Sequence, residues 1–219
     1  MSETKKRKLI NWLGLSGVLS FLSYAAAVIF SPMDFPGYKW MEQAVSDLSA
    51  EKAPSRMLWN RLSAFYGFGG MVCVACVCIL ISEKKIGSRL FRVGIYLFAV
   101  MNLISEVGYK MFPLDDSGKK IESFQEVMHI VVTVAVVLLS IVSLVILIVA
   151  SCKKKGVPHL GIWAAIALAM MFVGAIGMKA VPAEYFGIVE RFSVFAAVGF
   201  NAVLGIYLFN GFRTLSKTK

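Results

Sequence analysis

The chain has 219 residues, of which 58% are hydrophobic and 16% charged, and its mean hydropathy is +0.73. Soluble domains have roughly 45–50% apolar and about 25% charged residues, so this composition excludes a soluble enzyme, a disordered chain and a disulfide scaffold. The net charge of +10 comes from short basic clusters between apolar stretches, without interleaved aromatic residues, and therefore indicates membrane topology rather than nucleic-acid binding.

Six apolar stretches, each close to the roughly 20 residues that cross a bilayer, predict six transmembrane helices. We expect them at residues 9–31, 62–82, 90–112, 127–150, 160–181 and 192–212. Only the connection 32–61 is long, so sequential helices should pack as antiparallel neighbours. The predicted fold class is all-α, a polytopic integral membrane protein with a single six-helix domain.

The first stretch follows four basic residues and ends near Ala25-Ala26-Ala27, which resembles the end of a signal peptide. The apolar run is longer than the hydrophobic region of a signal peptide, so we expect it to be kept as an uncleaved span.

Lysine and arginine predict the orientation of the spans. The N-terminus, the second and fourth connections and the C-terminal tail hold 14 of the 23 basic residues: Lys5, Lys6, Arg7, Lys8, Lys84, Lys85, Arg89, Arg92, Lys153, Lys154, Lys155, Arg213, Lys217 and Lys219. Because basic connections stay in the cytoplasm, both termini are predicted to be cytoplasmic, with the acid-rich connections outside.

Three cysteines, Cys73, Cys76 and Cys78, have a spacing that resembles a metal site. They lie inside an apolar helix without a neighbouring histidine or acid, so we expect them to pack as small hydrophobic side chains. The sequence predicts no cofactor.

Related phrases recur where the odd-numbered helices reach the outer surface: Pro32-Met33-Asp34, Pro113-Leu114-Asp115 and Pro182-Ala183-Glu184. The second and sixth helices also begin alike, with Arg61-Leu62-Ser63 and Arg191-Phe192-Ser193. The chain is therefore predicted to contain three repeated hairpins. Proline as a helix stop and acids before the next helix explain each phrase structurally as well.

The first outer connection, 32–61, is predicted to contain an amphipathic helix in the membrane interface. Trp40, Met41, Ala44, Val45 and Leu48 would share its apolar face. Ser46 and Asp47 would lie on or beside its polar face, either simply hydrated or directed by a re-entrant lid towards His129.

Two polar groups lie within or beside the spans. Asn102, Glu106 and Lys110 form one stripe along the third helix, where Glu106 and Lys110 are either a structural ion pair or part of a site. His129 follows Gln125 and Glu126 at the entry to the fourth helix. With Asp115, Asp116 or Glu126 nearby it would carry protons or bind a metal, or it would only bond headgroups or another helix.

Taken in order, several motifs resemble the bacterial membrane proteins grouped as domain of unknown function 998. They are Ser46-Asp47-Leu48, Pro54, Asn60-Arg61, Phe112-Pro113-Leu114-Asp115, His129 and Gly187-Ile188-Val189-Glu190-Arg191. The family commonly has glycine after Ser-Asp-Leu, where this chain has Ser49. The loop and the histidine are more distantly similar to the Frag1/DRAM/Sfk1 group, some members of which are implicated in lipid remodelling or asymmetry. The resemblance implies a multi-pass protein of the bacterial plasma membrane.

The leading functional prediction is an outward-facing polar pocket that binds a lipid headgroup or small amphiphile. Basic residues would hold a phosphate, with acidic residues and His129 as acceptors, and the candidate binding residues are Arg61, Glu106, Lys110, Lys179, Glu190 and Arg191. The expected partners are membrane lipids, not nucleic acid, and the oligomeric state stays open.

Three alternatives stay open. A membrane-embedded hydrolase would use Ser46, Asp47, Asp115 and His129, with Asp47, Asp115 and His129 as weak metal candidates. A proton-coupled transporter would use Glu106 and Lys110. In a structural or accessory protein, the same polar residues would only lock the helices together.

Overall fold

The computed structural model describes residues 7–115, 123–153 and 157–212. Eight residues discussed above lie outside these ranges: Lys5, Lys6, Asp116, Lys154, Lys155, Arg213, Lys217 and Lys219. Within the described ranges, all regular secondary structure is helical.

Eleven helical elements are present in these ranges: α1 (Leu9–Trp12), α2 (Leu15–Phe30), η1 (Ser31–Asp34), η2 (Ser46–Ser49), α3 (Arg56–Leu62), α4 (Tyr66–Glu83), α5 (Arg89–Met111), α6 (Phe124–Ser151), α7 (Pro158–Ala180), η3 (Ala183–Tyr185) and α8 (Phe186–Phe209). They form six segments long and apolar enough to cross a membrane: Leu9–Asp34, Arg56–Glu83, Arg89–Met111, Phe124–Ser151, Pro158–Ala180 and Ala183–Phe209. The predicted all-α fold with six membrane-spanning segments is confirmed.

Local sequence explains where several of these helices begin. The Ser88 side chain accepts a hydrogen bond from the Phe91 N–H (3.1 Å) at the start of α5. Ser123 and Glu126 form a reciprocal capping box at the start of α6. Pro158 occupies the first turn of α7, where no N–H is needed.

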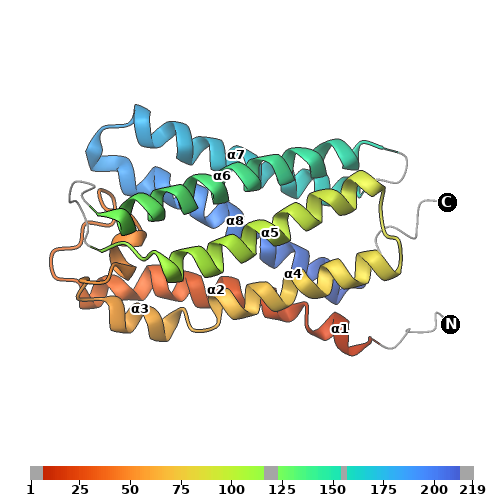
Figure 1. Cartoon of the computed structure of the whole chain (residues 1–219), viewed down its shortest axis with the longest axis horizontal. Coiled ribbons are helices and arrows are strands. Elements are labelled where there is room, and N and C mark those ends of the chain that lie inside the picture. Colours follow the sequence, from red (N-terminus) through yellow and green to blue (C-terminus); the bar gives the residue numbers. More distant parts are fainter. Residues whose placement is uncertain (1–6, 116–122, 154–156, 213–219) are drawn as a thin grey trace.

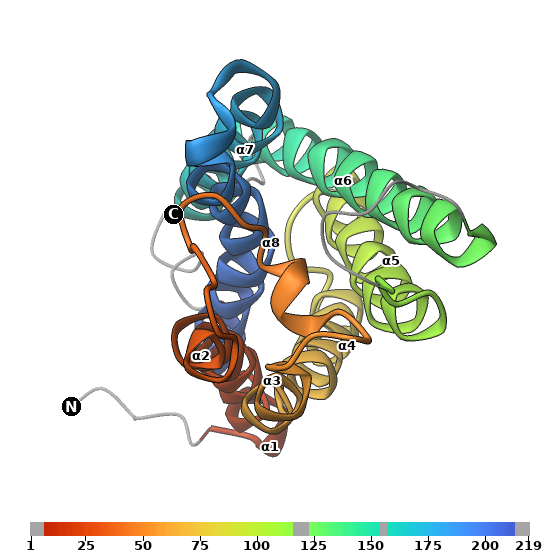
Figure 2. The same ribbon diagram turned by 90° about the vertical axis from the view of Figure 1, so that its left-hand side faces the viewer.

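Each long helix packs against the next one in sequence, and α8 closes the arrangement against α2 and α4 (Figure 2). The start of α1 and the end of α8 lie at one end of the bundle, which we call the terminal end (Figure 1). The connection between η1 and α3, residues 35–55, lies at the opposite loop end. The cytoplasmic orientation of the termini and the hairpin repeat stay predictions.

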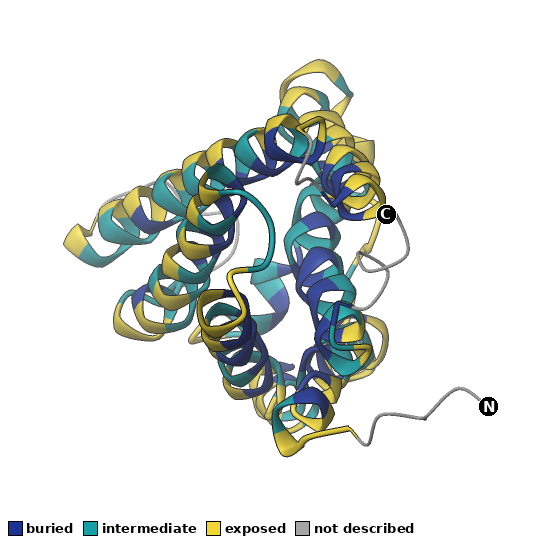
Figure 3. Cartoon of the chain, turned by 90° about the vertical axis from the view of Figure 1, so that its right-hand side faces the viewer, coloured by how far each residue is buried: buried dark blue, intermediate teal, exposed yellow. Residues whose placement is uncertain are grey.

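Two apolar cores fill the bundle. The larger core lies towards the terminal end and contains Phe91, Phe98, Leu144 and Leu204. The smaller lies at the loop end, where Tyr24, Val45, Leu48, Trp59 and Val198 are buried together. Seen from the terminal end, buried residues face the interior and exposed ones face outward (Figure 3), as expected for helices surrounded by lipid.

The first predicted span, 9–31, is not one continuous helix. It breaks between α1 and α2, where Gly14 meets Gly205 of α8. A Cβ on Gly14 would lie 2.4 Å from the Gly205 carbonyl oxygen, so the two backbones are in direct contact. Beside the break, Asn11 Nδ2 donates to the Leu208 carbonyl (2.8 Å). Tight backbone packing against α8 accompanies the break.

The interfacial helix expected in residues 32–61 stays a prediction. Residues 35–45 are turns, bends and irregular backbone, followed by η2 and α3. Val45 and Leu48 are buried in the loop-end core, whereas Trp40 is 55% exposed. These apolar residues therefore do not share one face, because Val45 and Leu48 pack inward instead of lying in the membrane interface.

Candidate functional site

Arg191, near the start of α8, fastens the 35–55 loop to the bundle. Its Nη1 donates to the carbonyls of Trp40 (2.7 Å), Gln43 (3.2 Å) and Gly187 (2.6 Å), and its Nη2 donates to the Tyr38 hydroxyl (2.8 Å). A planar guanidinium suits this set of acceptors because its donors point in fixed directions. The loop therefore binds the Arg191 guanidinium, the group that the sequence analysis assigned to a phosphate.

Two neighbours of Arg191 complete this attachment. The Val45 N–H donates to Glu190 Oε2 (3.2 Å), and the Gly187 N–H donates to the Met41 carbonyl (2.7 Å). A Cβ on Gly187 would lie 2.4 Å from the Gln43 carbonyl oxygen, so only glycine lets the loop approach this closely. The Gly187–Arg191 motif is therefore a docking surface for the loop.

Asp47 and Tyr38 lie beside this attachment, and both are partly buried. Asp47 Oδ2 accepts from the Ala44 N–H (3.1 Å), while the Tyr38 hydroxyl donates to the Ala44 carbonyl (2.9 Å). Burial raises the pKa of Asp47 and outweighs the Ala44 hydrogen bond and the charge of Arg191, which lower it. Burial likewise raises the pKa of Tyr38, although the charge of Arg191 and its hydrogen bond lower it. Because its pKa is raised, the Tyr38 hydroxyl stays protonated and acts as a donor.

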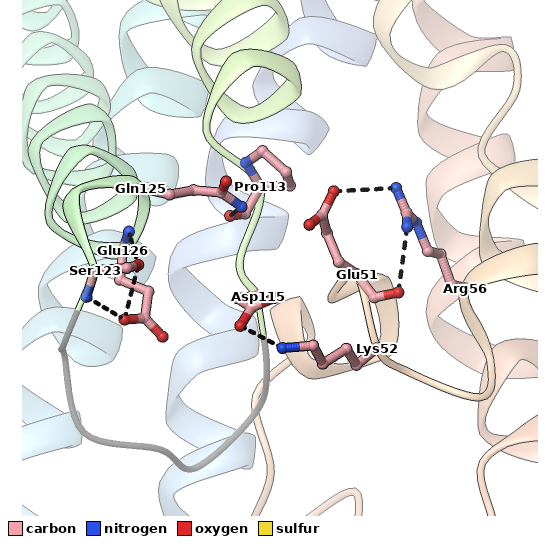
Figure 4. A network of polar contacts seen from close by, with 8 residues as sticks. All are labelled: Glu51, Lys52, Arg56, Pro113, Asp115, Ser123, Gln125 and Glu126. Carbon is pink, nitrogen blue, oxygen red and sulfur yellow. Dashed lines mark hydrogen bonds and ion pairs between the residues drawn. The ribbon is translucent and has the colours of Figure 1, made fainter.

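The other side of the loop is fastened to the end of α5 (Figure 4). Lys52 Nζ pairs with Asp115 Oδ2 (2.6 Å), and the Glu51 N–H donates to the Leu114 carbonyl (2.8 Å). Arg56 pairs with Glu51 (3.5 Å). Seen along the bundle, the loop lies across its end, between α8 on one side and α5 on the other (Figure 2). We call residues 35–55 the roof.

His129 joins α6 to the end of α5. Its Nδ1 lies 2.8 Å from the Phe112 carbonyl oxygen, and because a carbonyl only accepts, Nδ1 carries the proton. Gln125 Nε2 donates to the next carbonyl, that of Pro113 (2.9 Å), and the His129 ring lies 5.1 Å from that of Tyr109. Both side chains thus satisfy carbonyls left unpaired where α5 ends.

The structure does not gather the four basic residues predicted to hold a phosphate. Arg61 on α3 and Lys179 on α7 are exposed. Lys110 pairs with Glu106 on α5 as predicted, and its side chain is 73% exposed. Arg191 in turn is bonded to the roof, so the four basic side chains lie in different surroundings and do not form one site.

The candidate hydrolase residues are also dispersed. Asp47, Asp115 and His129 each have the partners described above, and Ser46 lies in η2, where its carbonyl accepts from the Ser49 hydroxyl (3.0 Å). In the described ranges, no three histidine, cysteine, aspartate or glutamate residues gather as a metal site.

Sequence reasoning missed three tyrosines that interact electrostatically with one another. Tyr24 of α2, Tyr66 of α4 and Tyr109 of α5 interact electrostatically with one another, and Tyr24 and Tyr109 also interact with Glu190. The rings of Tyr24 and Tyr66 lie 4.6 Å apart. We call these four residues the tyrosine–glutamate cluster.

A model of the family described as "Protein of unknown function (DUF998)" matches residues 18–207. The chain belongs to this family. No curated protein and no solved structure matches the chain. The match to DUF998 covers the four middle membrane-spanning segments completely and most of the first and last, together with the roof and the tyrosine–glutamate cluster.

Several polar side chains also form hydrogen bonds within and between the long helices of this DUF998 protein. Asn201 Nδ2 donates to Asn102 Oδ1 (3.3 Å), and Asn102 Nδ2 donates to the Phe98 carbonyl (2.8 Å). Ser20 Oγ donates to the Tyr66 carbonyl (2.6 Å). Asn102 was predicted to lie on a stripe with Glu106 and Lys110, but its partner is on α8. The amide pair therefore links α5 to α8 at mid-bundle.

Proposed function

We propose that this multi-pass membrane protein binds the polar headgroup of a lipid or another small amphiphile at its loop end, beneath the roof. One observation carries this proposal. The roof, fastened on two sides, covers polar groups that the protein itself does not satisfy. The Tyr24 hydroxyl and the second oxygen of Glu190 have no hydrogen-bond partner among the described residues, and neither atom is fully enclosed.

Buried polar groups normally have partners, since leaving one unpaired costs about 1–3 kcal/mol. Tyr24 is only 6% exposed, so its free hydroxyl is not an ordinary surface group. Because the Tyr24 hydroxyl and the second Glu190 oxygen keep accessible surface, water reaches them, and a ligand that supplies the same hydrogen bonds would replace that water. This supports a binding role for the cluster.

The surroundings favour an amphiphile over a water-soluble ligand. Large apolar side chains are exposed on the outside of the bundle. Examples are Leu138 of α6, Ile162 and Ile176 of α7 and Ile206 of α8. A lipid with its chains against such surfaces would bring its headgroup to the depth of the roof. The proposed plasma-membrane location, with cytoplasmic termini and an outward roof, rests on the basic clusters, and the resemblance to the Frag1/DRAM/Sfk1 group agrees with a lipid ligand.

The hydrolase and transporter alternatives receive less support. The candidate acid and base, Asp115 and His129, tether the roof and α5 instead of facing each other. Glu106 pairs with Lys110 within one helix, and that lysine is largely exposed.

Native mass spectrometry of the gently purified protein tests the proposal. We expect a retained amphiphile in the wild type and its loss in Gly187→Ala, which pushes the roof away from α8. Gly199→Ala is the matched control on the same helix, since its Cβ would meet only Phe21, at 3.9 Å. A folded wild type without bound amphiphile, or equal retention in both variants, would contradict the proposal.

A further inference from the structure

We infer that the connection between α4 and α5 binds the phosphate of an anionic phospholipid. We call residues 84–89 the basic turn. This site is separate from the one proposed beneath the roof, because the basic turn lies at the terminal end of the bundle (Figure 1). Its charges, its backbone and the apolar face of α5 beside it all fit such a ligand.

The basic turn carries three exposed cations within six residues: Lys84, Lys85 and Arg89. None of the ion pairs in the described ranges includes them. The exposed Glu83 beside them offsets one of these three positive charges, which leaves a net charge of +2. Unpaired lysine and arginine side chains near a membrane surface favour anionic lipids.

Hydrogen bonds hold the backbone of the basic turn in one shape. The Ile86 N–H donates to the Ile81 carbonyl (3.0 Å), and Arg92 Nη1 donates to the carbonyls of Ile86 (3.4 Å) and Gly87 (3.1 Å). Gly87 has a φ of +67°, and a Cβ there would lie 2.5 Å from Cδ1 of the buried Phe91. The three cations therefore extend from a backbone that is already ordered, which lowers the cost of binding a ligand.

Arg89 also continues an apolar stripe along the outside of α5. The other members of this stripe follow at intervals of three or four residues, so they share one face of the helix. All of them are exposed: Val93, Tyr96, Val100, Leu103 and Val107. A phospholipid whose chains lie along this stripe would bring its phosphate to Arg89 and the two lysines.

The charge of the basic turn favours an anionic lipid over a zwitterionic one. A phosphate accepts hydrogen bonds from both lysine and arginine. In phosphatidylcholine, the trimethylammonium group beside the phosphate would be repelled by the same cations. Phosphatidylglycerol has no such group, so the full charge of its phosphate is available to the basic turn.

The test compares phosphatidylglycerol and phosphatidylcholine with identical chains. Each is titrated onto the full chain in detergent, and binding is measured by native mass spectrometry. We expect the wild type to bind phosphatidylglycerol about tenfold more tightly than phosphatidylcholine.

Two variants of the basic turn should reduce this preference about fivefold each. One combines Lys84→Gln with Lys85→Gln, and the other is Arg89→Gln. All three side chains are exposed and lack ion-pair partners among the described residues, so both variants should keep the Tm of the wild type.

The matched control combines Lys8→Gln with Lys153→Gln. It removes the same charge as the double lysine variant from exposed side chains at the terminal end, but outside the basic turn. It should keep most of the preference for phosphatidylglycerol. Gly187→Ala should keep it as well, because that change affects the roof at the opposite end.

Several results would overturn the phosphate site. They are equal binding of the two lipids to the folded wild type, a preference that survives both turn variants, and equal losses in the double lysine variant and its control, which would indicate attraction to charge alone. Loss of the preference in Gly187→Ala would place it at the roof and overturn the site as well. A preference lost only when the basic turn is changed would support it.

Discussion

The two halves of the bundle are packed with different kinds of side chains. At the terminal end, the large core is formed mainly by aliphatic and aromatic side chains from α4 to α8. At the loop end, the smaller core includes roof residues and lies beside Glu190, Arg191 and three tyrosines. At the terminal end the buried polar side chains Asn11 and Ser151 bond backbone carbonyls, whereas the loop end gathers charged groups beside its core, which mark the half in which the proposed function is expected.

Glycines show the same difference. Gly205 brings the backbones of α8 and the α1–α2 junction together at the terminal end, whereas Gly187 brings α8 against the roof. The first contact joins two membrane-spanning segments, and the second joins a helix to a loop. Added side chains at these positions should therefore have separable effects.

Gly205→Ala should have the largest effect on stability. Its Cβ would lie 2.3 Å from the Gly14 carbonyl oxygen, and a backbone atom cannot move aside alone. We expect the free energy of unfolding to fall by about 2 kcal/mol, measured as a lower Tm in detergent. Gly199→Ala should leave Tm within error of the wild type, and an equal Tm for both variants would contradict the close backbone contact.

Arg191→Lys should release the roof and leave the terminal end intact. Lysine keeps the charge but not the fork that reaches three carbonyls and Tyr38, so the docked roof should lose about 2 kcal/mol. Hydrogen exchange should then rise more than tenfold in residues 38–48 alone. Arg61→Lys is the control, because Arg61 aligns with Arg191 in the predicted repeat yet is exposed. Equal protection of the roof in both variants would contradict the proposed attachment.

His129→Ala should have a smaller effect, confined to the α5–α6 hairpin. The change removes the Nδ1–H donor to the Phe112 carbonyl, which is worth about 1 kcal/mol. We expect slightly faster hydrogen exchange at the end of α5, with amphiphile binding retained. Loss of the amphiphile from a fully stable His129→Ala protein would instead show that His129 contributes to amphiphile binding.

The pH dependence of roof docking should be the smallest effect. Because burial raises the pKa of Asp47, the docked roof favours the neutral carboxyl. This contribution is fully present below the ordinary pKa of about 3.9 and is lost as the pH rises through the raised value. Glu190, Arg191 and Tyr38 also face Asp47.

Asp47→Asn isolates this contribution, since it keeps the acceptor for the Ala44 N–H and removes the titration. Hydrogen exchange of the roof, corrected for intrinsic rates, should increase less with pH in Asp47→Asn than in the wild type. Identical pH profiles would show that Asp47 does not contribute.

The sequence predicted the spans well, because apolar length is a local property of the chain. It predicted the Glu106–Lys110 pair for the same reason, since residues four apart on one helix are neighbours. The Gly187–Arg191 motif was recognised through the family resemblance, although its arginine was assigned to a ligand instead of the roof.

The features that the sequence did not predict depend on contacts between distant parts of the chain. The burial of Val45 and Leu48 could not be predicted, because they share a core with Tyr24 of α2 and Val198 of α8, which are far away in sequence. The basic residues did not gather because the direction of each side chain depends on how its helix packs. Tyr24 was missed because a tyrosine near the end of a span usually marks the membrane interface.

Photocrosslinking with a phospholipid that carries a reactive group on its headgroup tests the central claim most directly. The labelled residues would be mapped by peptide mass spectrometry in wild-type protein within a bilayer. Binding beneath the roof predicts adducts on Tyr24, Tyr66 or Glu190, and their loss when an excess of the same phospholipid without the reactive group competes. Adducts confined to exposed residues such as Met33 and Trp40 would contradict the account.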